Sequence, residues 1–390
     1  MAKVKITGHA SGSGVLTITA PNTSTDRTIT LPDATGTLLN SDGSAANLTA
    51  IPAAQVTGTL PAISGASLTG IGGRRNLVKN GGFDVWQRGT SFSNVSGKNY
   101  IADRWWCTPN SGAHTQTRQA SGLDGFDYCL RMQRTAGQSA GGVVYLLNEF
   151  ESIDSSRHRG KKLTFSFYAR KGANFSHASS QITSNLISGT GTNQSLSAGL
   201  TGGANLISLT NTLTTSWQRF THTTSSVVAS NVNQICIQFT TAHAGTAGAN
   251  DYYELAGVQL EVGTEATDFE HRSYGEELAL CQRYYFIKGQ VARTCYGVAA
   301  CHTATSIFTC VAFPVTMRAS PSMSQYSDPT TCYITGSGQN QATQNTNMGT
   351  EGLNPNGCTV TATGSSLSGG NAYWFNTVDA QHWLAWEAEI

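Results

Sequence analysis

The chain has 390 residues, with 24 Lys and Arg against 23 Asp and Glu and a formal net charge of +1. Only 12% of the residues are charged, roughly half the ~25% of an ordinary soluble domain. So few cations exclude the electrostatic footprint of a nucleic-acid-binding protein, and no apolar run reaches the ~18 residues that membrane insertion needs. With 42 Gly, the composition is typical of an all-β, turn-rich protein.

The N-terminal part lacks aromatic side chains: no Phe, Tyr, Trp or Cys precedes Phe83. Such a segment buries too little area to offset an ordering cost of ~1.5 kcal/mol per residue, so we expect other chains to order it. Alternating residues predict short strands at 15–19 and 27–32. Sparse apolar residues over 48–71 predict a ribbon that packs on copies of itself, with a flexible linker as the alternative.

The middle of the chain, from about residue 74 to 272, reads as a series of short strands separated by turn signals. Strands are predicted at 143–147, 163–169, 217–223, 235–240 and 252–260. The stretch 163–169 places Leu, Phe, Phe and Ala on one face and polar residues on the other, apart from one Tyr. Several such strands without an amphipathic helix among them predict a two-sheet sandwich.

The last third opens with a helix signal. Ser273 and Glu276 have the spacing of a capping box, in which each side chain satisfies a free N–H group of the first helical turn. Beyond this helix, strands are predicted at 306–315 and 383–390, and the Gly/Asn/Thr-rich stretch 336–356 is expected to be loop.

Several stretches resemble proteins of tailed bacteriophages. Residues 29–38 and 56–66 resemble the N-terminal and shaft regions of tail fibres. Residues 76–89 and 102–105, with later strands at 164–170, 217–220 and 252–261, resemble a jelly-roll module of phage structural proteins that is similar to carbohydrate-binding modules of the family four/nine type. Residues 269–285 resemble the junction that follows this jelly roll in tail-fibre and receptor-binding proteins.

The resemblance implies an all-β architecture in five parts. We expect a virion-attachment segment of extended or β structure at 1–40, an intertwined neck or linker at 41–73, and a jelly-roll β-sandwich at 74–272. A connecting helix at 273–286 and a small C-terminal β tip domain at 287–390 complete the arrangement.

The same resemblance implies a structural virion appendage, a phage tail fibre that attaches to a host-surface receptor, most simply a glycan. Its expected partners are two further copies of itself in a homotrimer and other virion proteins bound through residues 1–40. It would be located in the virion tail after assembly in the host bacterial cytoplasm. The alternatives are a head fibre, capsid decoration or tail adaptor protein, and a glycan-degrading tailspike or bacterial carbohydrate-binding protein.

No catalytic motif stands out, so we expect no enzyme activity. Asp124/Asp127, Asp251/Glu254 and Glu276/Glu277 are close carboxylate pairs, but turn, strand and helix-cap positions explain them.

Sugar binding needs aromatic faces beside polar groups. Neighbouring strand residues face opposite ways; if Trp105 is in the core, as the resemblance implies, Trp106 lies on the other face. Trp106, Tyr373 and Trp374 are therefore the candidate receptor contacts, with burial under a loop or against another chain as the alternative.

The sequence predicts no cofactor. The nine cysteines are odd in number and form no C-x-x-C motif, which favours reduced, buried thiols, although disulfides near the C-terminus remain open. Modules of the resembling jelly-roll type sometimes hold a structural calcium ion. Asp84 and Glu261, near the first and last strands, are the candidate ligands.

Overall fold

The computed structural model describes residue 11 and residues 75–93, 97–109, 113–325, 332–336, 339–343, 348–363, 367–377 and 382–390. The expected attachment segment (1–40) and neck (41–73), with their strands at 15–19 and 27–32, fall outside the described residues except for Ser11. The described residues between 75 and 390 belong to one compact unit. The proposed domain boundaries therefore stay predictions.

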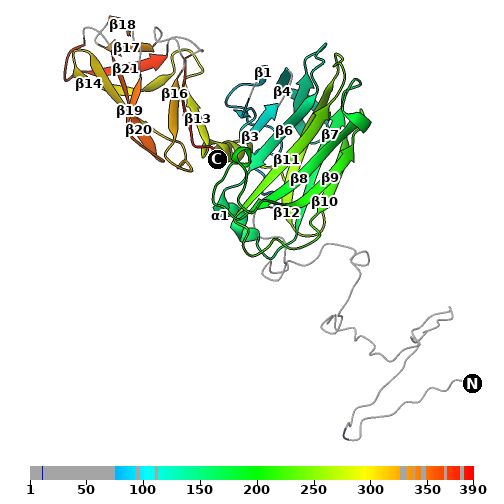
Figure 1. Cartoon of the computed structure of the whole chain (residues 1–390). Helices are drawn as coiled ribbons and strands as arrows, with labels where there is room; N and C mark the ends of the chain where they lie inside the picture. The colour runs from blue at the N-terminus through cyan, green and yellow to red at the C-terminus, as the bar shows by residue number, and fades with distance from the viewer. Residues whose placement is uncertain are drawn as a thin grey trace, which may run out of the picture. The chain divides into compact units, whose positions relative to one another are not determined.

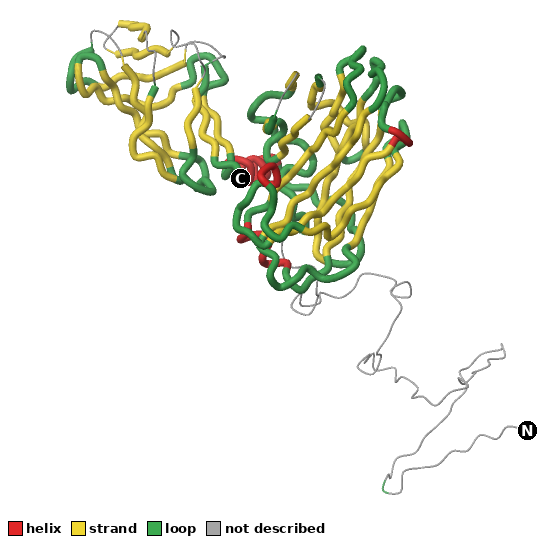
Figure 2. Tube along the Cα trace, in the orientation of Figure 1, coloured by secondary structure: helices red, strands yellow, loops and turns green. Residues whose placement is uncertain are grey.

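Two six-stranded antiparallel sheets form a sandwich, which confirms the predicted all-β fold (Figures 1 and 2). The first sheet has the order β1 (Ser91–Ser93), β4 (His114–Leu123), β5 (Phe126–Arg134), β12 (Tyr252–Val262), β7 (Leu163–Lys171) and β10 (Gln218–Thr223). The second has the order β2 (Asn99–Tyr100), β3 (Trp105–Pro109), β6 (Gly142–Glu149), β11 (Gln234–His243), β8 (Gln181–Gly189) and β9 (Ala204–Thr212). The five strands predicted here all exist, most of them one to three residues longer than predicted.

The core of the sandwich lies between these sheets and is rich in aromatic rings. Phe165 and Phe167 of β7 lie 5.7 and 4.9 Å from the ring of Phe239 on β11. Trp105 is fully buried, and its indole N–H donates to the Asn80 carbonyl at 2.9 Å. Because Trp105 faces this core, the alternation of β3 turns Trp106 to the outer face of the second sheet.

Within the described residues the helical elements are short. They are α1 (Ser152–Ser155), η3 (Ser156–His158), η4 (Ala178–Ser180), η5 (Leu196–Ala198) and α2 (Tyr274–Gln282). Ser273 caps α2 by accepting a hydrogen bond from the Glu276 N–H at 3.4 Å, as the capping box predicts. The helix ends before residue 286 because the chain enters a strand at Tyr285. Neither α-helix of the described residues has the length or apolar character to cross a membrane.

The remaining strands form two further antiparallel sheets. One has the order β13 (Tyr285–Lys288), β22 (Leu384–Glu387) and β16 (Ser322–Gln325). The other has the order β18 (Gln339–Thr343), β17 (Cys332–Gly336), β21 (Ala372–Thr377), β14 (Cys295–Thr303), β15 (Ser306–Ala312), β20 (Gly357–Thr363) and β19 (Gly349–Asn354). The expected loop at 336–356 is wrong in part, because β18 and β19 lie within it. β18 pairs with β17, and β19 pairs with β20.

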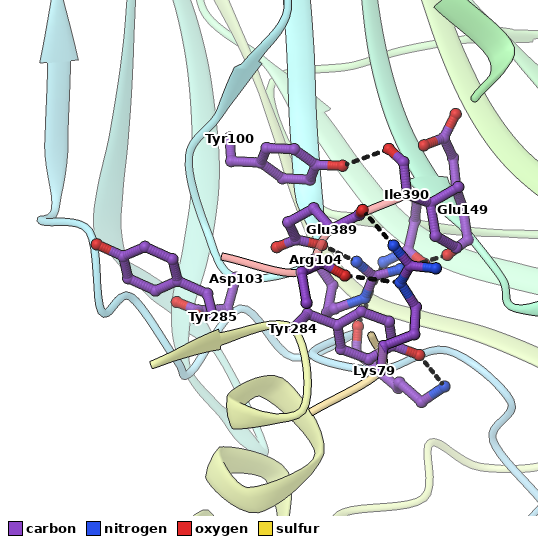
Figure 3. A network of polar contacts seen from close by, with 12 residues as sticks. Lys79, Tyr100, Asp103, Arg104, Glu149, Tyr284, Tyr285, Glu389 and Ile390 are labelled. Atoms are coloured by element: carbon purple, nitrogen blue, oxygen red, sulfur yellow. Dashed lines mark hydrogen bonds and ion pairs between the residues drawn. The ribbon is translucent and has the colours of Figure 1, made fainter. Parts of the chain in front are cut away.

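A polar network joins the sandwich to residues 389 and 390 (Figure 3). Arg104 donates to the Glu389 carboxylate, and its guanidinium lies 3.6 Å from the centre of the Tyr284 ring. Tyr100 and Lys98 donate to the Ile390 backbone oxygen at 3.2 and 2.6 Å. The Arg104 and Glu389 side chains are almost fully buried, and Arg88 approaches the same carboxylate at 3.2 Å, so two cations compensate this buried acid.

Candidate functional site

The outer face of the second sheet carries a pocket of about 500 Å³. Its floor is a row of side chains across three neighbouring strands: Trp106 on β3 lies opposite Leu147 on β6, which lies opposite Gln238 on β11. One step along the strands, Thr108 lies opposite Tyr145. Alternation places all five side chains on the same face.

Two walls enclose this floor. Lys98, just before β2, holds its ammonium 4.7 Å from the centre of the Trp106 ring. Leu196 and Ser197 of η5 form the facing wall. The buried carboxylate of Glu149 accepts from the Leu196 N–H at 2.5 Å and from the Ser195 hydroxyl at 3.1 Å, and it lies 3.6 Å from the Lys98 ammonium. One buried charge therefore positions both walls.

The pocket offers polar groups that the protein leaves unused. Trp106 is only 1% exposed, and its indole N–H has no acceptor among the described residues. Leaving a buried donor unpaired costs about 1–3 kcal/mol, but this N–H lies beneath the surface of the pocket and is not a contact point for a ligand. The Gln238 carbonyl oxygen accepts from Asn185 and Thr240, which leaves its amide N–H groups for another partner.

The two aromatic residues of the pocket, Trp106 and Tyr145, differ in how much of their surface is exposed. Trp106 is covered by its neighbours and its indole N–H is buried, so the ring supports the floor of the pocket from beneath and is not an open stacking face. Tyr145 is half-buried and keeps part of its ring open. A ring with a C–H face could pack on Tyr145 while its hydroxyls meet Lys98, Gln238, Thr108 and Ser197.

The other two predicted receptor contacts lie in the C-terminal sheet and differ from each other. Tyr373 is 8% exposed, and its hydroxyl accepts from the Ser368 N–H at 3.1 Å, which makes it part of the local core. Trp374 is 57% exposed and lies opposite the equally exposed Val298. The structure thus does not bring these two residues together with Trp106 in one site, and only Trp106 lines the pocket described above.

The calcium candidates lie in different surroundings. Glu261 accepts from the Thr267 N–H at 2.9 Å, the Thr267 hydroxyl at 2.7 Å and the Gln259 amide at 2.9 Å, so its oxygens are engaged in a turn. Asp84 lines a separate pocket beside Asp127. Among the described residues, no three His, Cys, Asp or Glu side chains gather where they could hold a metal ion. The two residues thus form no joint site.

The close carboxylate pairs are mostly engaged in structural contacts. Asp251 accepts from Arg134 at 3.1 Å with both side chains fully buried, and Glu254 lies between Arg131 and Arg170 at 2.6 and 2.5 Å. Glu277 accepts from the Asn80 N–H at 2.6 Å. Each of these acidic groups stabilises a loop or strand end.

Sequence reasoning missed Lys98, Tyr145, Gln238 and the η5 wall. These residues come together through the pairing register of β3, β6 and β11. The sequence of one strand does not predict its register with strands that are distant in the chain. The available signal was alternation: once Trp106 is placed outward, the outward positions of its neighbours are the ones to inspect.

No protein-family model and no curated protein matches this sequence. Similar solved structures include one described as "CBM4 structure and function". It shares 16% sequence identity with this chain, the match covers 48% of this chain and 99% of that one, and the TM-score is 0.29. A CBM61 module in complex with β-1,4-galactotriose has 11% identity over 49% of this chain and all of that one, with a TM-score of 0.29. The enzymatically active domain of tailspike protein 4 of bacteriophage CBA120 has 11% identity over 48% of this chain but 21% of that one, with a TM-score of 0.31. Likenesses this weak assign no function, and the sandwich is established here by its own strand order and registers.

Proposed function

We propose that the sandwich binds a glycan in the Trp106 pocket, and that the chain is a non-enzymatic virion appendage of the tail-fibre or receptor-binding type. The observation that carries the glycan proposal is the walled pocket of about 500 Å³ over the Trp106 ring, which presents Lys98, Tyr145 and Gln238. Sugars combine hydroxyl donors and acceptors with apolar ring faces, and this pocket presents matching groups of both kinds.

The virion role rests on the sequence rather than on the pocket. The tail-fibre-like stretches at 29–38 and 56–66, and the jelly-roll-like stretch at 76–89, stand in the order that a fibre would need. The aromatic-free N-terminal part favours assembly with other copies. On this proposal the chain forms a homotrimer in the virion tail, and several weak glycan sites per particle give tight attachment through avidity.

The glycan proposal is tested by titrating the full chain with neutral oligosaccharides, starting from an array of bacterial surface glycans and of cellotriose- and maltotriose-type fragments. Gln238→Ala and Tyr145→Ala should each weaken binding of the glycan that the array selects about tenfold, the amount that a lost hydrogen bond or ring contact of ~1.4 kcal/mol gives. Trp374→Ala is the control and should bind normally. Absence of any glycan bound by the unmodified chain, or equal losses in all three variants, would refute the proposal.

The virion role is tested separately. Mass photometry of the purified chain should give three times the mass of one copy, and antibodies against it should label virion tails in electron micrographs. A monomer would contradict the trimer, and label on the capsid would favour a head fibre or decoration protein. Release of reducing sugar from host polysaccharide would overturn the non-enzyme proposal.

A further inference from the structure

A second pocket, of about 480 Å³, opens on a different part of the sandwich. Arg118 of β4 and residues 126–128 at the start of β5 line it on one side. His271 and Arg272, just before α2, and Tyr274, the first residue of α2, line the other. Asp84 completes the lining from the loop before β1. None of these residues lines the Trp106 pocket, so the two hollows are separate.

The polar side chains around this second pocket have few partners in the protein. Within the described part of the chain, no hydrogen bond or ion pair engages the carboxylates of Asp84 and Asp127 or the guanidinium of Arg118. Arg118 instead lies over the Tyr128 ring, 4.2 Å from its centre. Asp84 is half-buried. A half-buried carboxylate without a donor is costly, which favours a donor supplied from outside the chain.

The pocket has an excess of negative charge. Arg272 is already paired with Glu277 at 3.0 Å, so it adds no free cation. Two unpaired carboxylates, Asp84 and Asp127, then face one unpaired guanidinium. Burial raises the pKa of Asp84, and the nearby charges of Glu277 and Asp127 raise it further against the opposing effects of His271 and Arg118. With two unpaired carboxylates against one unpaired guanidinium, the pocket favours a positively charged donor.

Aromatic rings provide the other half of the recognition surface. Tyr274 is largely exposed at the pocket, and Tyr128 and Phe126 line it beside the carboxylates. Phe126 is fixed by rings on three sides, with centroids of Tyr168, Phe269 and His271 between 5.0 and 5.5 Å away. A rigid aromatic wall next to carboxylates suits a ligand that has an apolar ring face and a cationic edge.

We propose that this second pocket, defined by Asp84, Asp127, Tyr128 and Tyr274, binds an amino sugar through its free ammonium group. The ammonium lies between the two carboxylates, and the sugar ring packs on the tyrosines. Arg118 donates hydrogen bonds to the ring hydroxyls. This site is independent of the Trp106 pocket, so its proposal holds or fails apart from the proposed glycan function.

The experiment compares three methyl glycosides on the full chain in the presence of EDTA: glucosamine, N-acetylglucosamine and glucose. Binding is followed by saturation-transfer NMR and calorimetry at neutral pH. The glucosamine glycoside should bind at least about tenfold more tightly than the other two, since charge-assisted hydrogen bonds are roughly twice as strong as neutral ones. Asp84→Asn should abolish this preference.

Asp124→Asn is the matched control, because Asp124 is exposed in the same β4–β5 turn but does not line the pocket. It removes the same charge and should keep the preference, as should Trp106→Phe. Thermal melting of each variant shows that it is folded. Equal binding of all three glycosides, equal binding of Nα-acetyllysine amide, or competition by Ca²⁺ when EDTA is omitted would each overturn the amino-sugar assignment.

Discussion

Two tryptophans on outward sheet faces show how differently the same residue can be presented. Trp106 on β3 is 1% exposed and lies in a hollow closed by Lys98 and η5, whereas Trp374 on β21 is 57% exposed beside Val298. The Trp106 hollow depends on distant parts of the chain, because Lys98 donates to the Ile390 backbone oxygen as well as contacting Glu149. A specific pocket needs such walls, and an exposed ring on an open sheet face lacks them.

The largest effect is expected from breaking the network that joins the sandwich to residues 389 and 390. Arg104→Ala should lower the free energy of unfolding by about 4 kcal/mol, since the buried Glu389 carboxylate would lose one of its two cationic partners and keep only Arg88 at 3.2 Å. It should also weaken binding in the Trp106 pocket, because Lys98 would lose its fixed position. Urea denaturation and glycan titration measure the two effects. Arg157→Ala, at an exposed position, is the control, and equal stabilities of the two variants would contradict the role of the network.

A somewhat smaller loss is expected at the floor of the pocket itself. Trp106→Ala should destabilise the protein by about 3 kcal/mol, because it leaves a cavity beside Leu147 and removes the ring under Lys98. Trp106→Phe keeps most of the packing and removes the buried, unpaired N–H, so it should cost less stability than Trp106→Ala and leave glycan binding nearly unchanged. Denaturation and titration of both variants separate packing from recognition. A stable Trp106→Ala protein would mean that the wall residues, not the ring, close this face.

The fold of the sandwich was largely predictable from the sequence because its central strands alternate clearly. β7 carries Leu163, Phe165 and Phe167 inward, and that pattern is readable without any structure. β4 was missed because its inward positions include His114 and Gln116, both polar and buried. Hydrophobic periodicity cannot detect a strand whose buried positions carry polar side chains.

The candidate site was predictable only in part. Alternation placed Trp106 outward, and a capping box placed α2, because both rules act within a few neighbouring residues. The partners of Trp106 come from β6, β11 and η5, whose positions depend on non-local registers and on the buried charge of Glu149. Tyr373 and Trp374 were equivalent candidates in the sequence. The structure distinguishes them because it shows which face of β21 packs on the core: Tyr373 is on that face and Trp374 on the exposed one.

Acid should affect the sandwich through a buried histidine. Burial, with help from His114, Arg134 and His177 and against Asp251, lowers the pKa of His243 to about 3. The folded state thus favours the neutral ring, while the unfolded chain titrates near the ordinary 6.5. This contribution to stability is present above pH 6.5 and is lost as the pH falls towards 3, by up to about 1.4 kcal/mol per pH unit.

His243→Gln should flatten this loss between about pH 7 and pH 5 in urea denaturation, while other groups keep titrating. His302→Gln in the C-terminal sheet is the control, since His302 is exposed on β14. If both variants kept the slope of the unmodified protein, another group of the sandwich would have to account for the acid sensitivity.

The smallest effect is expected at the exposed ring that opens the comparison. Trp374→Ala removes a side chain with more than half of its surface in water, so the free energy of unfolding should change by no more than about 0.5 kcal/mol. The mass distribution of the Trp374→Ala protein, measured by mass photometry, is more informative than its stability. If the β21 face contacts a second copy in the proposed trimer, the Trp374→Ala protein should dissociate at protein concentrations where the unmodified chain stays assembled, because a large aromatic ring contributes strongly at a desolvated interface. An unchanged trimer would instead leave Trp374 as an open surface residue, and would assign trimer contacts to other parts of the chain.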